Sequence, residues 1–413
     1  EMPVAEVEKA NVVVLVGCNP RHEMPLLGAR IRKAARRGAK IYAINPLDFE
    51  LDFDFAIAAK KIAAPGAFVD VLLGLAKAAN DAGHPPESGD LAEAVRGVEA
   101  DPFSKGLIEA LAAAEAAVVV VGEGATLHPQ ASLLRAAARF LARATRSACN
   151  ELPSGANALG LAAVGVLPGA GGLGARAMLE QPRRSYVLYG CEPPHDFADG
   201  AAALAALGAA EHVVAFAAYA SDALKRVAGV ILPIGLLPEI DATLVNVDGA
   251  AQTVAAAAKL PGDARPGWKV LRALGAALGA DGFDFVDIGE LRAQVGTPAL
   301  PAPVADAKLA ARAPAADGLV RIATTAIYAG DAVLRRAPAL QAHPLARLRG
   351  VVLHPEDALA RGLGHGGRAR IGDAVLPVEV SARVPRGAAW IEAGHAETAA
   401  LPAYGAALDV VKA

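Results

Sequence analysis

Short apolar runs alternate with longer amphipathic stretches along this chain, and the alternation predicts an α/β protein. Val12–Val16 is an unbroken apolar run, which is typical of a buried strand. Residues 25–37 follow with apolar positions at helical spacing and a basic outer face, and residues 40–44 form the next strand-like run. The three segments together predict a βαβ unit, in which the two strands are parallel and the crossover is right-handed.

The same alternation continues for about 200 residues more and predicts a second α/β lobe. A doubly wound sheet produces this order of strands and helices. The segment 81–90 contains Gly83, Pro85 and Pro86, so we predict a first lobe over residues 1–85 and a second over residues 86–296. The further strand-like runs are 117–121, 186–189, 212–216 and 230–232, and the clearest helical stretches are 68–80 and 130–144.

The pattern changes after residue 296. Several prolines stand among alanines in residues 297–318, which predicts a linker. Beyond it, short strand-like runs at close spacing are divided by glycine and proline, so we predict a small β-rich, barrel-like domain over residues 319–413. These runs are 351–353, 369–371, 376–380 and 389–391.

Composition narrows the classes of partner. The formal net charge of the 413 residues is −3, which gives no electrostatic reason to expect a nucleic-acid partner. Residues 154–175 carry no charge and are long enough to span a bilayer, but they contain Pro168 and many glycines, so we predict a buried or mobile loop and no membrane insertion. The first residues lack the pattern of a signal peptide, which predicts a cytoplasmic protein.

Two of the strand-like runs end in the same turn. The first continues into Gly17-Cys18-Asn19-Pro20, and the run at 186–189 continues into Gly190-Cys191-Glu192-Pro193. A strand that stops at glycine presents backbone N–H groups at the carboxyl edge of its sheet, where nucleotides and phosphates bind in open α/β folds. We therefore predict two lobes that face one ligand. Cys18, Cys191 and Cys149 lack metal-ligand spacing, so no metal site is predicted.

Other candidate sites are weaker. Residues 169–174 formally satisfy G-x-G-x-x-G, and Glu192 follows as an acidic ribose ligand, which is the best case for a nicotinamide site. Pro168 and Pro182 interrupt the strand and helix that such a site needs, so a flexible glycine loop is the preferred interpretation. Three groups of acidic and histidine residues are not interpreted as catalytic or metal sites. Asp52 and Asp54 are interpreted as a solvated strand edge, and His195 and Asp196 as sequence neighbours whose side chains do not face a common centre. His354, Glu356 and Asp357 are interpreted as the start of a helix.

Three stretches resemble the molybdopterin oxidoreductases. Residues 17–20 with 44–46 resemble the pattern G-x-N-P…I-D-P-R, residues 228–268 resemble A-D-V-V-L-P…E…G-T…N-x-E-G-R-x-Q…P-G…W, and residues 351–358 resemble the start of the dinucleotide-binding barrel. The resemblance implies two Rossmann-like lobes of the formate dehydrogenase/DMSO reductase-like fold, followed by a barrel. It places a pterin cleft at Gly17, Cys18, Asn19, Asn45, Gly190, Glu192, Glu239, Thr243, Asn246 and Gln252.

Residues 19–25, 156–160 and 327–336 are similar to one branch of that family, the large G subunits of bacterial NADH-quinone oxidoreductase, respiratory complex I. In that branch the fold is a scaffold that generally carries no molybdenum. The resemblance implies other subunits of the complex I peripheral arm as partners and a cytoplasmic position at the inner membrane. It also places iron–sulfur clusters in domains that would precede Glu1, so the chain is expected to be a fragment.

The cleft departs from the cofactor-binding pattern at several positions. Asn45 and Leu47 stand where such members have Asp and Arg, Glu192 stands where the first turn has Asn19, and Ala250 replaces an Arg. Each lost charge-assisted hydrogen bond is worth about 1.5–3 kcal/mol. We therefore predict a vestigial cleft that binds pterin weakly or not at all and a chain that is not catalytic by itself. A functional formate dehydrogenase-like enzyme and a nicotinamide-binding oxidoreductase remain the alternatives.

Overall fold

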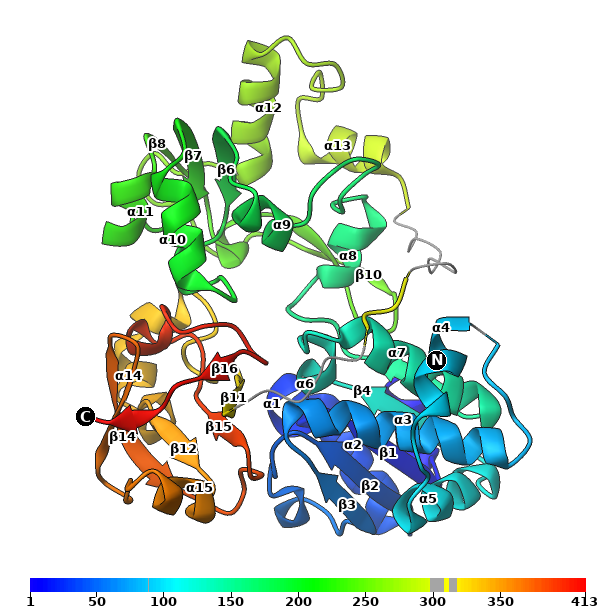
Figure 1. The fold of residues 1–413 in the computed structure, drawn as a ribbon. Helices are drawn as coiled ribbons and strands as arrows, with labels where there is room; N and C mark the ends of the chain where they lie inside the picture. Colours follow the sequence, from blue (N-terminus) through cyan, green and yellow to red (C-terminus); the bar gives the residue numbers. More distant parts are fainter. Residues whose placement is uncertain (88, 298–307, 312–317) are drawn as a thin grey trace. The chain divides into compact units, whose positions relative to one another are not determined.

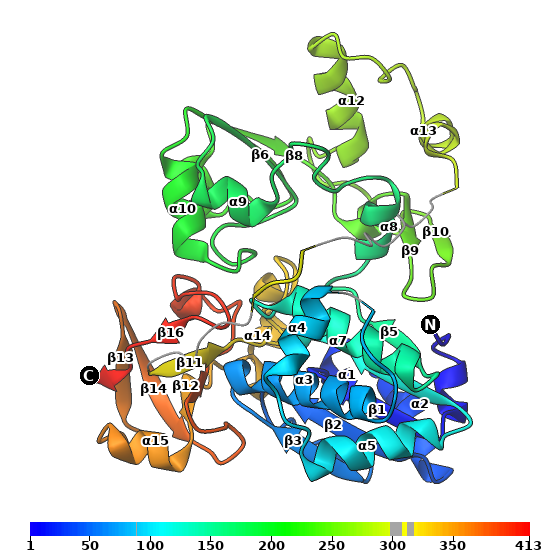
Figure 2. The same ribbon diagram turned by 45° about the vertical axis from the view of Figure 1, so that its right-hand side comes forward.

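A computed structural model describes residues 1–87, 89–297, 308–311 and 318–413. The chain forms two compact units (Figures 1 and 2). The first unit takes residues 1–154, 304–329 and 339–413, and the second takes residues 155–303 and 330–338.

The first unit is built on a parallel five-stranded sheet. Its strands lie in the order β3 (Ala59–Ile62), β2 (Lys40–Asn45), β1 (Val12–Val16), β4 (Ala117–Val121) and β5 (Ala148–Glu151). The strand order reverses between β1 and β4, which is the switch point of a doubly wound sheet and the usual place for a ligand. This sheet confirms the predicted α/β fold.

Alternate residues of β1 enter two different cores. Val12 and Val14 pack with apolar residues of α3, α4, α5 and α7, whereas Val13 and Leu15 pack with η1 and α2 on the other face. Because both faces are covered, β1 and β4 consist almost entirely of fully buried valines. The helical elements are η1 (Glu6–Lys9), α1 (Pro20–Glu23), α2 (Pro25–Arg36), η2 (Leu51–Phe53), α3 (Pro65–Asp81), α4 (Gly89–Arg96), α5 (Pro102–Ala112), α6 (Glu123–Thr126) and α7 (Ala131–Ala144).

The predicted boundary at residue 85 is wrong. Val12 pairs with Ala117 and Val16 pairs with Val121, so β4 belongs to the first sheet and not to a second lobe. A strand that is buried on both faces needs a neighbour on each edge, and β4 finds them in β1 and β5. The glycine- and proline-containing segment after residue 81 only joins α3 to α4.

The C-terminal residues form a seven-stranded mixed sheet, which confirms the predicted β-rich part. Ile322, Val352 and Trp390 of this sheet share a core with Val13 and Leu15, which explains why it belongs to the first unit. The strand order is β16 (Ala407–Leu408), β11 (Leu319–Ile322), β15 (Ala388–Trp390), β12 (Val351–Leu353), β14 (Ala374–Val380), β13 (Arg368–Ile371) and β17 (Val411–Lys412). The helical elements are α14 (Pro338–Gln341), η5 (Pro344–Ala346), α15 (Pro355–Ala360) and η6 (Ala396–Thr398).

Most of the predicted linker, residues 298–307 and 312–317, lies outside the described residues. The short stretch between these gaps is anchored to the first unit. The backbone N–H of Ala310 donates to Ser132 Oγ at 2.8 Å, and Gln130 Nε2 donates to the carbonyl of Ala311 at 2.7 Å. This part of the predicted linker is therefore fixed against α7.

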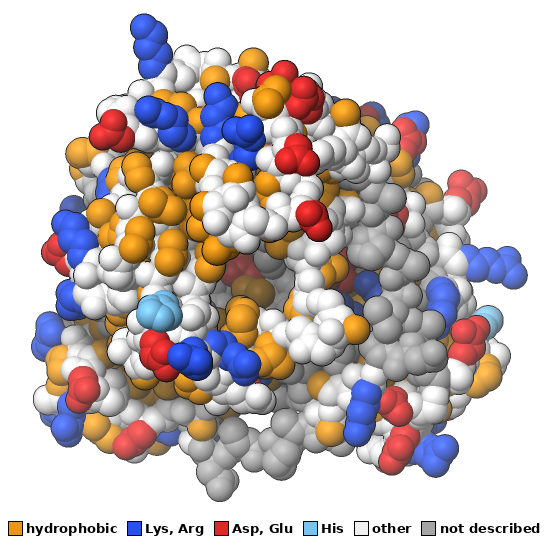
Figure 3. Space-filling view, turned by 90° about the horizontal axis from the view of Figure 1, so that it is seen from above, with side chains coloured by type: hydrophobic (Ala, Val, Ile, Leu, Met, Phe, Trp, Pro, Cys, Tyr) orange, Lys and Arg blue, Asp and Glu red, His pale blue; other side chains and the backbone are white. Residues whose placement is uncertain are grey.

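The second unit contains a parallel sheet of three strands, β6 (Ser185–Tyr189), β7 (His212–Ala217) and β8 (Val230–Pro233), and an antiparallel hairpin of β9 (Ala242–Val245) and β10 (Ala251–Val254). Tyr186 and Leu188 are buried, whereas Val187 and Tyr189 on the opposite face are at least half exposed. Hydrophobic side chains gather on the surface of this part (Figure 3). Its helical elements are α8 (Ala158–Ala163), α9 (Ala175–Glu180), α10 (Gly200–Gly208), α11 (Asp222–Val227), η3 (Leu237–Glu239), α12 (Gly267–Ala277), α13 (Ile288–Val295) and η4 (Leu334–Arg336).

The uncharged stretch 154–175, predicted as a buried or mobile loop, is not buried. It contains α8, and about half of the surface of Leu161, Val164, Val166 and Leu167 is exposed. Over the residues that the structure describes, no helix combines the length and apolar character needed to cross a membrane.

Candidate functional site

The first glycine turn is held by its own strands. Gly17 has φ +57°, and its N–H donates to the carbonyl of Ile44 at 2.8 Å. The next N–H, from Cys18, donates to Asn45 Oδ1 at 2.8 Å. Asn45 is buried and holds the turn from the neighbouring strand, at a position that the resemblance placed in the pterin cleft. A structural role therefore accounts for this side chain.

Glu23 lies at the switch point of the first sheet. Its Oε1 accepts a hydrogen bond from the N–H of Asn19 at 2.6 Å, and its Oε2 accepts one from the N–H of Glu123 at 2.7 Å. These two N–H groups follow β1 and β4, the strands between which the order reverses. In open α/β folds, nucleotide phosphates accept hydrogen bonds from N–H groups at this position. In this chain the carboxylate of Glu23, on α1, accepts those hydrogen bonds instead.

Burial dominates the chemistry of Glu23. It raises the pKa of this carboxyl from 4.5 to about 7, although the N–H donors of Asn19 and Glu123 favour the charged form. Glu23 therefore changes its charge near neutral pH.

A cavity of about 470 Å³ lies next to Glu23 within the first unit. The guanidinium groups of Arg349 and Arg383 each lie 5.4 Å from the ring centroid of Trp390, and burial raises the pKa of Glu392 beside them. This cavity leaves no local signal in the sequence, because its lining comes from the first turns and from the distant β-rich sheet. Charged and aromatic residues of the lining include Arg21, Glu23, Glu50, Glu123, Arg347, Arg349, Arg383, Trp390, Glu392 and Tyr404.

The second turn repeats the first in geometry. Gly190 has φ +66°, and its N–H donates to the carbonyl of Phe216 at 2.8 Å. The N–H of Glu192 donates to Asp196 Oδ2 at 2.7 Å, just as the N–H of Asn19 donates to Glu23 four residues later. The sequence carried this signal: both turns read G-C-x-P-x-H followed by an acid, over residues 17–23 and 190–196.

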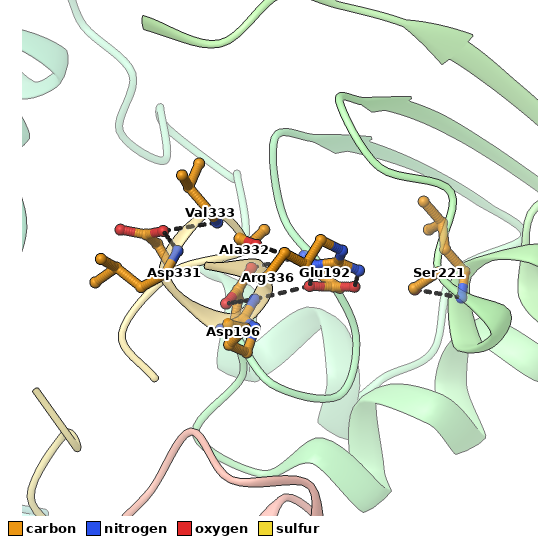
Figure 4. Close-up of polar contacts among 10 residues, drawn as sticks. Glu192, Asp196, Ser221, Asp331, Ala332, Val333 and Arg336 are labelled. Carbon is orange, nitrogen blue, oxygen red and sulfur yellow. Dashed lines mark hydrogen bonds and ion pairs between the residues drawn. The ribbon is translucent and has the colours of Figure 1, made fainter. Parts of the chain in front are cut away.

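Glu192 is held by Arg336 (Figure 4) and by Arg335, which come from a distant part of the chain. Arg335 donates to Glu192 Oε2 at 2.9 Å and to Asp196 Oδ1 at 2.9 Å. Arg336 donates to both carboxylate oxygens of Glu192, at 3.0 Å for Oε2, and its guanidinium lies 4.5 Å from the ring centroid of Tyr219. Burial opposes the ionisation of Glu192, but the hydrogen bonds from Arg336 and Arg335 prevail and lower its pKa to about 2.

The remaining predicted ligands hold local structure in the second unit. Glu239 accepts from the N–H of Leu236 at 2.8 Å, and Thr243 Oγ1 accepts from Arg292 Nε at 3.1 Å. Asn246 Oδ1 accepts from the N–H groups of Asp248 and Ala250 and so shapes the turn between β9 and β10. Gln252 is exposed on β10.

The weaker candidates resolve in different ways. The residues before the glycine loop 169–174 form α8 instead of a strand, and α9 after it has only six residues, so the dinucleotide-binding arrangement of strand, loop and helix is not formed there. His354 Nδ1 accepts the N–H of Glu356 at the start of α15, which confirms the predicted helix start. Asp52 and Asp54 are wrongly predicted as a strand edge, because η2 forms there and Asp54 pairs with Arg32 at 2.9 Å.

The cysteines do not have the environment of reactive thiolates. Burial raises the pKa of Cys18 and of Cys191, and it raises the pKa of Cys149 to about 11. A reactive thiolate requires a shift in the opposite direction. Within the described ranges, no group of three or more His, Cys, Asp or Glu side chains is placed to hold a metal ion.

A pterin dinucleotide would compete with protein groups for these two turns. Its diphosphate needs N–H donors and cationic side chains. In the protein, Glu23 and Asp196 already accept hydrogen bonds from these N–H groups. The arginines at the second turn form ion pairs with Glu192 and Asp196. The predicted site residues fall into a group at residues 17–45 in the first unit and groups at 190–192 and 239–252 in the second. That the two turns face one ligand stays a prediction.

Comparisons with known proteins agree with the resemblance. The chain is similar to the mitochondrial NADH-ubiquinone oxidoreductase 78 kDa subunit of Neurospora crassa, with 28% identity over 294 residues, which are 70% of this chain and 33% of that protein. It is also similar to the 75 kDa subunit of NADH-ubiquinone oxidoreductase from Reclinomonas americana, with 24% identity over 277 residues, or 67% of this chain and 35% of that protein. The chain thus spans about a third of the length of these relatives.

A third relative is NADH-quinone oxidoreductase subunit 3 of Thermus thermophilus, with 32% identity over 171 residues, which are 41% of this chain and 20% of that protein. Among solved structures, acetylene hydratase from Pelobacter acetylenicus has the same fold, with a TM-score of 0.65 and 14% identity over 95% of this chain and 74% of that one. The family model for molybdopterin oxidoreductases matches residues 1–277. The chain therefore belongs to the molybdopterin oxidoreductase family.

Proposed function

We propose that the chain is a structural part of a subunit of NADH-quinone oxidoreductase, respiratory complex I, and has no active site of its own. Electrons pass from NADH to quinone through iron–sulfur clusters in other domains of that subunit. This region keeps neighbouring subunits of the peripheral arm in register at the cytoplasmic face of the inner membrane. The three relatives that are subunits of NADH-ubiquinone or NADH-quinone oxidoreductases support this assignment.

One observation supports the proposal that the chain has no active site of its own: Glu23 accepts hydrogen bonds from the N–H groups of both Asn19 and Glu123 at the switch point. A bound diphosphate would have to displace this carboxylate and would leave it buried without its hydrogen bonds. Leaving a buried acceptor unsatisfied costs about 1–3 kcal/mol, and more if it is charged. The exposed apolar residues of α8 and the following loop, by contrast, suit a contact with another protein.

Metal analysis tests the absence of a cofactor. The protein is purified from cells that are supplied with molybdate and tungstate and that make an active molybdopterin enzyme, which is purified in parallel as the control. We expect no stoichiometric molybdenum or tungsten and no fluorescent pterin after oxidation of the denatured protein. About one metal ion per chain would overturn the proposal.

Assembly of the complete complex tests the structural role. Two single variants are compared: E23A removes the bridging carboxylate, and E109A, the control, removes an exposed carboxylate on α5. We expect E23A to lower the amount of assembled complex, while NADH oxidation per assembled complex stays unchanged. A loss of rate per complex without a loss of assembly would contradict the proposal.

The alternative of a working molybdopterin or nicotinamide enzyme has one observation in its favour, the cavity beside Glu23. Its volume falls in the range of small-molecule sites, about 300–1,000 Å³. The metal analysis tests the first form of this alternative. Calorimetric titration with NADH and NADPH tests the second, for which we expect no heat of binding.

A further inference from the structure

The second turn has the charge of a cation site. A phosphate site offers N–H groups and positive side chains, whereas this turn presents the carboxylates of Glu192 and Asp196. Glu192 is only 6% exposed. The buried carboxylate of Glu192 requires a positive partner, because an unpaired charge is strongly disfavoured away from water. The carboxylate of Asp196, an exposed residue, adds a second negative charge, and Arg335 contacts both carboxylates.

The positive partners come from residues 330–338, which we call the strap. Along the chain, the residues on both sides of the strap belong to the first unit, while the strap itself belongs to the second. Asp331 shapes it, because Asp331 Oδ1 accepts the N–H groups of Val333 and Leu334, both at 2.8 Å, and starts η4 (Figure 4). The two arginines of η4 then meet the turn.

We propose that the turn formed by residues 190–196 is a guanidinium-binding site and that the strap is its resident ligand. Arg335 bridges the two carboxylates, and Arg336 forks onto both oxygens of Glu192. Two positive and two negative groups meet, so the site is neutral when the strap is bound. The turn thus shares the backbone geometry of the first turn but binds cationic side chains.

The site selects guanidinium over ammonium. A forked contact with one carboxylate needs two N–H groups in a plane, which arginine has and lysine lacks. The guanidinium of Arg336 also lies against the ring of Tyr219, where a planar cation is favoured. Lysine at position 336 would therefore keep the charge but lose both the fork and the flat contact.

Hydrogen exchange of the strap, read by mass spectrometry, tests the proposal. The N–H groups of Arg335, Arg336 and Ala337 donate to carbonyls within the strap, so they exchange slowly only while the strap is bound and ordered. In E192Q we expect exchange of these amides to rise about tenfold or more, because breaking a buried ion pair leaves charge uncompensated. The matched control is E211Q, which removes the exposed pair with Arg184 in the same unit and leaves the strap unchanged.

Chemical rescue tests the ligand class. In R336A the strap exchanges quickly, and millimolar methylguanidinium restores its protection, whereas methylammonium at equal concentration does not. The amides of α10 serve as the check that the unit is folded. If α10 also loses protection in E192Q or R336A, those variants are unfolded, and R336K is used in their place. In R336K we expect faster exchange in the strap and unchanged exchange in α10.

Any one of three results would overturn the proposal. The first is that the strap amides of the unaltered protein exchange at the rate of an unfolded peptide. The second is that the strap of E192Q exchanges no faster than that of E211Q, and the third is that methylammonium rescues protection as well as methylguanidinium does. Each of these is independent of the metal analysis, so the strap proposal and the proposed function fail separately.

Discussion

Glu23 and Asp196 make the same hydrogen bond in the two units: each carboxylate accepts the backbone N–H of the residue four positions before it, at 2.6 and 2.7 Å. Both follow a glycine turn at the end of a parallel strand. They differ in their second partner, which is the N–H of Glu123 for Glu23 and the guanidinium of Arg335 for Asp196. The carboxylate of Glu23 is therefore stabilised by two backbone N–H groups, whereas that of Asp196 is stabilised by one backbone N–H group and a guanidinium.

The first consequence is a pH dependence of the first unit that arises from Glu23. Its pKa of about 7 in the folded state lies above the ordinary value of 4.5, so the folded state holds the proton more tightly than the unfolded state does. Stability then falls by about 3 kcal/mol as the pH rises from about 4.5 to about 7. E23Q should remove this slope.

Trp390 can report this transition. The chain has two tryptophans, so W268F leaves Trp390 in the core of the first unit as the only fluorescent tryptophan. Urea unfolding of W268F and of W268F with E23Q is compared at several pH values, with E109Q as the exposed control. An equal slope in the E23Q protein would show that Glu23 is not the group that titrates.

The two turn glycines should differ in their tolerance of alanine. A Cβ at Gly17 would lie 2.4 Å from the backbone nitrogen of Ala125, whereas a Cβ at Gly190 meets nothing within 4 Å. Both have positive φ, which costs an alanine about 1–2 kcal/mol. G190A should lose about that much stability, and G17A should lose clearly more, because backbone must move. Hydrogen exchange at β1 and β6 measures the two losses, and equal losses would contradict the steric argument.

The sequence predicted elements that carry their own signal. β4 matches its predicted bounds, because a strand buried on both faces is an unbroken apolar run. β3 and β5 were missed, since these strands are short, only partly buried and include polar residues such as Lys60 and Asn150. The wrong boundary at residue 85 has a related cause: local turn residues mark a break in an element, while the pairing of β4 with β1 is a long-range contact.

The candidate site shows the same division. The paired turns were visible as a repeated motif, and the charge of Glu192 was noticed. Its partners Arg335 and Arg336 were not predicted, since a contact between residues about 140 positions apart leaves no local pattern. The bridge from Glu23 to Glu123 was missed for the same reason.

His128 should give the first unit an acid sensitivity of opposite sign. Its Nδ1 accepts the N–H of Gln130 at 3.0 Å and its Nε2 lies 3.0 Å from the carbonyl of Pro65, so the ring is neutral with its proton on Nε2. Burial lowers its pKa from 6.5 to about 4. The unfolded state therefore binds the proton more tightly, and stability is lost as the pH falls from about 6.5 to about 4, by about 3 kcal/mol.

The slope from Glu23 overlaps that from His128, so the measurement is made in the protein that carries W268F and E23Q. H128L should remove the loss of stability between about pH 6.5 and pH 4, while the exposed control H84Q should keep it. NMR titration of the His128 ring gives a second reading. A ring that becomes charged above pH 6 would refute the neutral assignment.

Arg321 should be among the side chains to which the β-rich sheet is most sensitive. It is 2% exposed, and its guanidinium donates to the carbonyls of Leu401, at 3.2 Å, and of Pro402. R321M keeps the volume but leaves the buried carbonyl of Leu401 without this donor, which costs about 1–3 kcal/mol, and it also removes the hydrogen bond to Pro402. We expect R321M to lose about 2–4 kcal/mol of stability and R321K to lose less, since an ammonium group retains the charge and a donor but not the fork. Urea unfolding followed by Trp390 measures both against R370M, which alters an exposed arginine on β13, and equal midpoints for R321M and R370M would rule out this role.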